Sequence, residues 1–149
     1  MPAPMRRVVL VCGPPGSGKT TLARSLGLDV YDMDDERWGN DASLFTTHLR
    51  RLGNDLDAQA VVIRSGATRT ARASAAALVG ATEVTVMTTA EAECVRRVIT
   101  RKRSRPPMRS QISAVHDWFV KHEPDTSLPN ATGSSLPQAT ISNVTIREW

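Results

Sequence analysis

The sequence predicts a single α/β domain in three layers: a parallel sheet of about five strands, helices on both faces, and an arginine-rich lid. Its 149 residues, 40% hydrophobic and 23% charged, are typical of one globular domain. Short runs of β-branched residues alternate with helical segments, which is the pattern of parallel sheets. A glycine-rich segment at 13–20 lies between the first such run and the first helix. We expect the domain to extend over residues 1–149.

The elements of the first third follow directly from local patterns. Residues 8–11 are β-branched or aliphatic and predict a strand buried on both faces, which ends at the glycines. A helix is expected over 20–26, with leucines at helical spacing and Gly27 closing it. Residues 28–31 predict the second strand.

The middle of the chain continues the alternation after the acidic stretch 32–36. Leucines at helical spacing predict a helix that carries Leu44, Leu49, Leu52 and Leu56. Residues 60–63 predict a third strand, the alanine-rich segment 70–79 a helix, and residues 83–87 a fourth strand.

The last third predicts a broken helix, a connector and a final strand. The helix begins at Thr89, its expected N-cap, with acidic residues in the first turn. Pro106 and Pro107 interrupt it, and it resumes a few residues later. An extended connector is expected over about 124–140, and a fifth strand over 141–146.

Composition argues against several classes of protein. The longest apolar run, 8–12, is far shorter than the roughly 20 residues that cross a bilayer, and no secretory apolar segment follows the N-terminus. Cys12 and Cys94 have neither the spacing of a zinc site nor the density of a disulfide scaffold. We expect a cytoplasmic protein without membrane contact. Its net charge of +4 permits an anionic partner.

Residues 13–20 match the phosphate-binding loop (P-loop) pattern Gly-x4-Gly-Lys-Ser/Thr in full. Glycines let backbone N–H groups turn toward phosphate oxygens, beside the positive end of the next helix. Lys19 is expected to reach the β and γ phosphates of ATP or another nucleoside triphosphate, and Thr20 to bind Mg²⁺. The nucleotide-binding residues predicted in this segment are Gly13, Pro14, Pro15, Gly16, Ser17, Gly18, Lys19, Thr20 and Thr21.

The rest of the chain separates the classes of P-loop protein. No Asn-Lys-x-Asp element that would read guanine is present, which argues against a GTPase. Neither the third nor the fourth predicted strand ends in the acidic residue that is usual in a motor ATPase. These absences favour a kinase.

The stretch Asp32-Met33-Asp34-Asp35-Glu36-Arg37-Trp38 resembles the kinase half of phage-type polynucleotide kinases and the zeta-toxin-like P-loop kinases. An Asp-Asp-x-x-Arg element follows the second strand in that family. The resemblance implies that Asp34 is the general base for the acceptor hydroxyl and that Arg37 binds the acceptor's phosphate. Asp34 could instead cap a helix. Asp32 could hold Mg²⁺ through water, or simply cap.

Basic residues are concentrated at the end of the first half of the broken helix and around the break. Seven of the 19 lie between residues 96 and 109, namely Arg96, Arg97, Arg101, Lys102, Arg103, Arg105 and Arg109. The same resemblance implies a lid over about 101–109, in which Arg101 is the catalytic arginine and Arg97 its helix partner, both binding the nucleotide. The alternative is a solvated helix face.

The chain departs from the family at the end of the third strand. Many relatives carry an aspartate where this chain has Arg64-Ser65-Gly66-Ala67-Thr68. Magnesium then relies on Thr20 and Asp32. The residues expected to line the altered acceptor pocket are Ser65, Thr68 and Arg69. Trp38 is expected to stack on a base or sugar of the acceptor, or else to pack beneath a helix.

The expected function is ATP-dependent transfer of the γ-phosphoryl group to a hydroxyl of DNA, RNA or a nucleotide, with Asp34, Lys19 and Arg101 as catalytic residues. The acceptor would be a 5′-hydroxyl end or a hydroxymethylated base such as 5-hydroxymethyluracil. Two alternatives stay open: a kinase for a nucleoside, sugar or antibiotic, and a regulator that binds ATP without catalysis. The resemblance also implies a phage or mobile-element origin.

Overall fold

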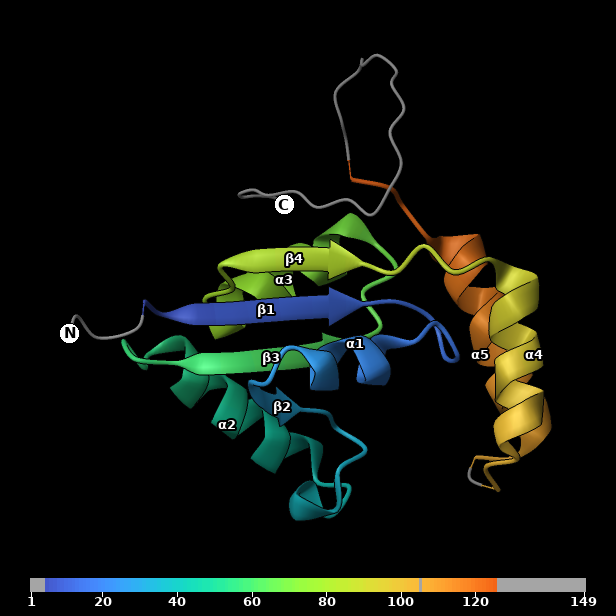
Figure 1. The fold of residues 1–149 in the computed structure, drawn as a ribbon, viewed down its shortest axis with the longest axis horizontal. Coiled ribbons are helices and arrows are strands. Elements are labelled where there is room, and N and C mark those ends of the chain that lie inside the picture. The colour runs from blue at the N-terminus through green and yellow to red at the C-terminus, as the bar shows by residue number, and fades with distance from the viewer. Residues whose placement is uncertain (1–4, 105, 126–149) are drawn as a thin grey trace.

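The structure, a computed structural model, describes residues 5–104 and 106–125 and has the predicted α/β architecture (Figure 1). Four parallel strands form a sheet in the order β2-β3-β1-β4. Their bounds are β1 (Arg7–Cys12), β2 (Asp29–Tyr31), β3 (Gln59–Arg64) and β4 (Glu83–Val86). The first four predicted strands are therefore confirmed. The predicted fifth strand at 141–146, and residues 126–140 of the connector, lie outside the described residues.

Helices cover both faces of the sheet. The helical elements of the described residues are α1 (Lys19–Ser25), the 3-10 turn η1 (Glu36–Trp38), α2 (Ala42–Gly53), α3 (Arg69–Val79), α4 (Glu91–Arg101) and α5 (Met108–Lys121). Figure 1 shows α1 in front of the sheet and α2 and α3 behind it. Among the described residues, no helix has the length and apolar character that a membrane span requires.

Strand β1 lies in the middle of the molecule because its side chains alternate between two cores. Val8 and Leu10 pack with residues of α2 and α3 in one core. Val9 and Val11 pack with Ala23 of α1 in the other. This double burial is what the continuous apolar run predicts.

Helices α4 and α5 pack against each other at the carboxyl ends of the strands (Figure 1). Their contact is a third core built from Cys94 and Val98 of α4 and Val115 of α5. The pair therefore stands beside the P-loop instead of covering the sheet.

Two predicted element ends are wrong. Leu56 lies beyond α2 and is 85% exposed, because the helix ends at Gly53. There α3 approaches so closely that a Cβ would lie 2.2 Å from the carbonyl oxygen of Leu78. Thr89 does not cap α4: Ala90 occupies the N-cap position, and the Thr89 hydroxyl instead donates to the backbone oxygen of a P-loop residue.

The chain leaves β1 and β3 toward opposite faces of the sheet, to α1 and α3 respectively. In open parallel sheets, ligands bind beyond the carboxyl ends of the strands at such a switch point. The loops after the two strands meet there, since the Gly13 backbone N–H donates to the Ser65 oxygen at 3.1 Å. The candidate site lies at this edge.

Candidate active site

The P-loop follows β1 and is shaped by glycines with positive φ. Gly16 has φ +78° and Gly18 has φ +96°, both in the left-handed region that favours glycine. A Cβ at Gly16 would lie 2.5 Å from the carbonyl oxygen of Cys94 on α4. The loop therefore needs glycine at this position for its backbone conformation and also for its close contact with α4.

Lys19, the first residue of α1, folds its side chain back over the loop. Its Nζ donates to the backbone oxygens of Gly13 (2.6 Å) and Pro14 (3.0 Å). Burial lowers the pKa of Lys19; the charge of Asp32 opposes this and that of Arg101 adds to it. The Lys19 ammonium group is thus held against the backbone of the P-loop.

Ser17 adds a polar group inside the loop. Its side chain is 1% exposed, and its Oγ has no hydrogen-bond partner among the described residues. A buried hydroxyl without a partner is unfavourable, so the position suits a ligand with acceptor oxygens. Together with the turned backbone, this hydroxyl fits the phosphates of a nucleotide.

The acidic stretch after β2 brings carboxylates to the same edge of the sheet. Asp32 accepts a hydrogen bond from the Asp34 backbone N–H at 3.1 Å. Asp35 caps η1 by accepting from the Arg37 N–H at 3.0 Å, whereas Asp34 caps none of the described helices. Within the described part of the chain, the Asp34 carboxylate makes no ion pair. It is thus placed where it could take a proton.

Arg97 and Arg101 lie one turn apart on α4 and have different partners. Arg97 donates to the Glu93 carboxylate at 2.9 Å, and its Nη1 lies 3.4 Å from the Gly16 oxygen. Arg101, the last residue of the helix, has its Nη2 3.4 Å from the Gln111 side-chain oxygen. Burial lowers the pKa of Arg101, against the opposite effect of the Asp34 charge.

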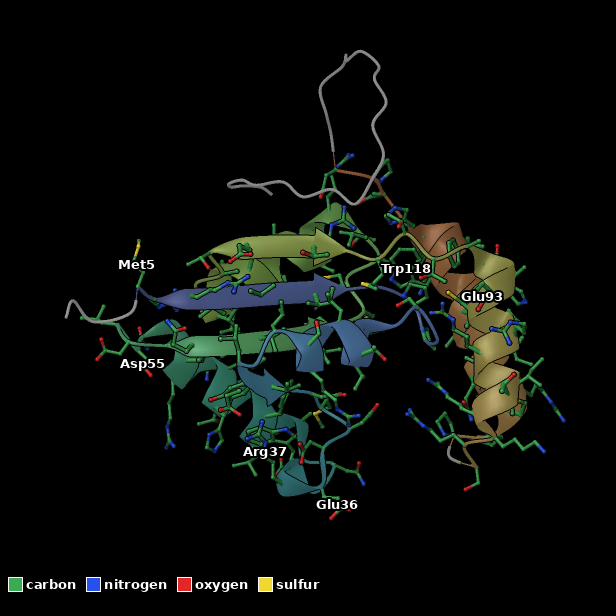
Figure 2. All side chains as sticks on the ribbon, viewed as in Figure 1. Met5, Glu36, Arg37, Asp55, Glu93 and Trp118 are labelled. Atoms are coloured by element: carbon green, nitrogen blue, oxygen red, sulfur yellow. The ribbon has the colours of Figure 1, made fainter. Side chains whose placement is uncertain are left out.

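Arg37 and Trp38 belong to η1, which follows β2. Figure 2 shows Arg37 on the side of the molecule away from α4. The Arg37 guanidinium donates to the Val30 oxygen and lies 4.6 Å from the centre of the Trp38 ring. Trp38 is 4% exposed and packs against Tyr31 and Phe45. The Arg37 guanidinium has partners within the protein, and Trp38 is packed in the core, although its Nε1 has no hydrogen-bond partner among the described residues. Acceptor binding by the two side chains stays a prediction.

The loop between β3 and α3 carries the other predicted acceptor residues. Ser65 is exposed and adjoins the P-loop through the hydrogen bond from Gly13. Thr68 caps α3 by accepting from the backbone N–H three residues later. The Arg69 backbone and side chain both donate to residues 123–124. Of the three, Ser65 is the one whose backbone accepts a hydrogen bond from the P-loop.

A cavity of about 300 Å³ lies between α2, β3 and α3, beside this loop. Sequence reasoning did not assign a role to Arg64, which lines it at the carboxyl end of β3. Its guanidinium carbon is 5.7 Å from the Phe45 ring centre, and its side chain is exposed. The sequence offered one signal: Arg64 stands at the end of the third strand, where many proteins of the family that the chain resembles carry an aspartate.

Comparison with known proteins establishes the fold. No family model and no curated protein matches the chain. A shikimate kinase from Acinetobacter baumannii, solved with shikimate, is 17% identical with a TM-score of 0.48, over 83% of this chain and 85% of its own. A sugar kinase from a Janibacter species is 19% identical with a TM-score of 0.50, over 88% and 84%. A protein designated APE1195 is 19% identical with a TM-score of 0.52, over 83% and 82%. The last two likenesses agree with the parallel α/β fold described above.

Proposed function

We propose that this protein is an ATP-dependent phosphotransferase that moves the γ-phosphoryl group to a hydroxyl of an acceptor. The observation that carries the proposal is the P-loop at the carboxyl end of β1, with the Lys19 side chain folded back over it. The segments that carry Asp34 and Arg101 follow β2 and β4, so the parallel sheet brings them to the same end. A phosphate site flanked by a carboxylate and an arginine suits phosphoryl transfer.

Each group has a separate task in this reaction. The loop N–H groups and Lys19 hold the β and γ phosphates. The acceptor oxygen forms a bond to the γ phosphorus while the bond from that phosphorus to the bridging oxygen breaks, and ADP leaves. Asp34 takes the acceptor's proton as this happens. Arg101 stabilises the negative charge on the transferring group.

Thr20 and Asp32 are the residues that would hold Mg²⁺. No group of three or more His, Cys, Asp or Glu side chains that could hold a metal is present in the described ranges 5–104 and 106–125. This fits Mg²⁺, which proteins often hold through one or two side chains together with phosphates and water. The ion would neutralise part of the triphosphate's charge.

The first acceptor that we propose is a hydroxyl of DNA or RNA, at a 5′ end or on a hydroxymethylated base. Lys102, Arg103 and Arg109 are exposed at the turn between α4 and α5. They extend positive charge beyond Arg101, and a nucleic-acid strand carries phosphates that such a surface attracts.

A small molecule is the second candidate, and the cavity beside β3 supports it. A volume of about 300 Å³ is at the lower end of the range for small-molecule sites. Apolar and small side chains line it, and Arg64 and Ser65 supply polar groups at the strand end. A compact hydroxylated molecule would match this lining.

The test is transfer of γ-labelled phosphate from ATP and Mg²⁺ to a panel of acceptors. The panel contains single- and double-stranded 5′-hydroxyl DNA and RNA, DNA with 5-hydroxymethyluracil, nucleosides and sugars. Label on a polymer would support the first candidate, and label confined to small molecules the second. ATP binding without label on any acceptor would contradict the proposal and favour a regulator.

A further inference from the structure

A buried glutamine lies between the lid arginine and the turn that follows it. Gln111, in the first turn of α5, is 3% exposed. The other buried polar or charged side chains of the described residues are Ser17 and Arg72. A buried amide is unfavourable unless its donors and acceptor are paired, so its partners indicate what it does.

The amide nitrogen holds the turn between α4 and α5. Nε2 donates to the backbone oxygens of Arg103 (2.7 Å) and Pro106 (2.6 Å). The helix has already ended, with Lys102 in the left-handed region at φ +51°, so these carbonyls lie outside its regular hydrogen bonding. Because a carbonyl can only accept, the nitrogen must face both oxygens, which fixes the orientation of the amide.

The amide oxygen consequently faces Arg101, whose Nη2 lies 3.4 Å away. Within the described residues Arg101 makes no ion pair, whereas Arg97, one turn earlier, is paired with the Glu93 carboxylate at 2.9 Å. Arg97 and Arg101 are thus held in chemically different ways. Arg97 is paired with a carboxylate that Arg96 also contacts, and Arg101 contacts a neutral oxygen.

We propose that Gln111 is a positioning residue that directs Arg101 toward the transferring phosphoryl group while leaving its positive charge uncompensated. The proposal rests on the phosphotransferase function proposed above. A neutral oxygen restrains the guanidinium without competing strongly with phosphate oxygens. A carboxylate in the same place would form an ion pair and hold the arginine back.

A double-mutant cycle between Gln111→Met and Arg101→Ala tests this. Methionine keeps the length of the side chain and removes its donors and acceptor. The readout is the affinity for ADP with aluminium fluoride, a mimic of the transferring group, relative to ADP alone, measured by calorimetry. It needs no acceptor, so it does not depend on which molecule is phosphorylated.

We expect Gln111→Met to weaken binding of the mimic by roughly tenfold or more, as loss of a hydrogen bond to a charged group does, with little change for ADP. In the Arg101→Ala background the same substitution should have no further effect. Losses that multiply in the double variant would show that Gln111 affects mimic binding independently of Arg101, and would overturn the proposal. Gln59→Met is the matched control, because its amide also donates to a backbone oxygen, far from the lid.

Gln111→Glu provides an independent arm should the methionine variant not fold. It keeps the side-chain shape and offers Arg101 a carboxylate, so we expect a loss of at least tenfold in mimic affinity. Affinity equal to the wild type would contradict the role of a neutral partner. A wild-type protein that binds neither ADP nor the mimic would refute the proposed function itself. That result differs from the one in which the wild type binds the mimic but the Gln111 and Arg101 substitutions lower its affinity independently of each other.

Discussion

At the scale of single residues, Gly16 allows the P-loop to pack closely against α4. Its φ of +78° favours glycine, and a Cβ would meet the carbonyl oxygen of Cys94 at 2.5 Å. Gly27 has a similar φ of +70°, but nothing lies within 4 Å of its would-be Cβ. Substitutions at Gly16 and Gly27 therefore separate the effect of backbone strain from the effect of close contact.

We expect Gly27→Ala to lower the free energy of unfolding by about 1–2 kcal/mol, the usual effect of a left-handed alanine. Gly16→Ala should lower it clearly more and also weaken ATP binding, because either the loop or α4 must move. Urea unfolding and calorimetric titration with ATP measure the two effects. Equal destabilisation with unchanged ATP affinity in both variants would contradict the contact.

His122 should make stability depend on pH. Burial lowers its pKa, and its ring stacks on Trp118 with 4.5 Å between centres. The unfolded chain, with the ordinary value near 6.5, then binds protons more readily than the native state, so stability falls as the pH drops below about 6.5. We expect His122→Phe, which keeps the stacking, to show a smaller decrease between pH 7.5 and 5.5. Identical decreases in chemical denaturation would refute this.

At the scale of elements, Arg72 ties α3 to the residues that follow α5. Its side chain is 3% exposed and donates to the oxygens of Gly66 (2.9 Å) and Ala67 (3.0 Å), and to the Asp125 carboxylate (2.9 Å). Arg69 adds hydrogen bonds to residues 123–124. The end of α5 is therefore held against the loop that follows β3.

Arg72→Met should lower the free energy of unfolding by about 3 kcal/mol, because buried oxygens and a carboxylate lose their donor. Asp125→Asn should cost less than about 1 kcal/mol, since Asp125 is partly exposed and the buried carbonyls keep their partner. Chemical denaturation of both variants measures the difference. Similar losses would mean that the ion pair, and not the carbonyl contacts, holds the junction.

The strands and most helices could be predicted because their signals are local. Residues 8–11 sit between two cores, and an unbroken apolar run expresses that burial directly. The end of α2 depends instead on how closely α3 approaches Gly53. Thr89 has the chemistry of an N-cap, but its hydroxyl donates to the P-loop at Ser17. Tertiary contacts of this kind leave no local pattern.

The candidate site was predictable to a similar degree. The P-loop is a contiguous motif, so its residues could be named from the sequence. Gln111 could not, because its role depends on three partners that the turn brings together. The contacts of Arg37 and Trp38 with β2 and α2 could not be predicted either, because they arise from tertiary packing beside the edge strand β2.

At the scale of the whole molecule, the parallel sheet delivers separate segments to one edge. The P-loop follows β1, the acidic stretch follows β2, the Ser65 loop follows β3, and α4 follows β4 (Figure 1). Because all four strands run the same way, their carboxyl ends gather these segments at one place. The division of labour that we propose, between nucleotide binding at the P-loop and proton transfer at Asp34, rests on this arrangement.

The most direct test of that division is to compare Asp34→Asn with Lys19→Ala, measuring ATP affinity by calorimetry and phosphoryl transfer with γ-labelled ATP. Asp34→Asn should bind ATP nearly as the wild type does and transfer phosphate about 100- to 10,000-fold more slowly, because an amide cannot take the acceptor's proton. Lys19→Ala should lose ATP affinity itself. Wild-type turnover in Asp34→Asn would contradict the account.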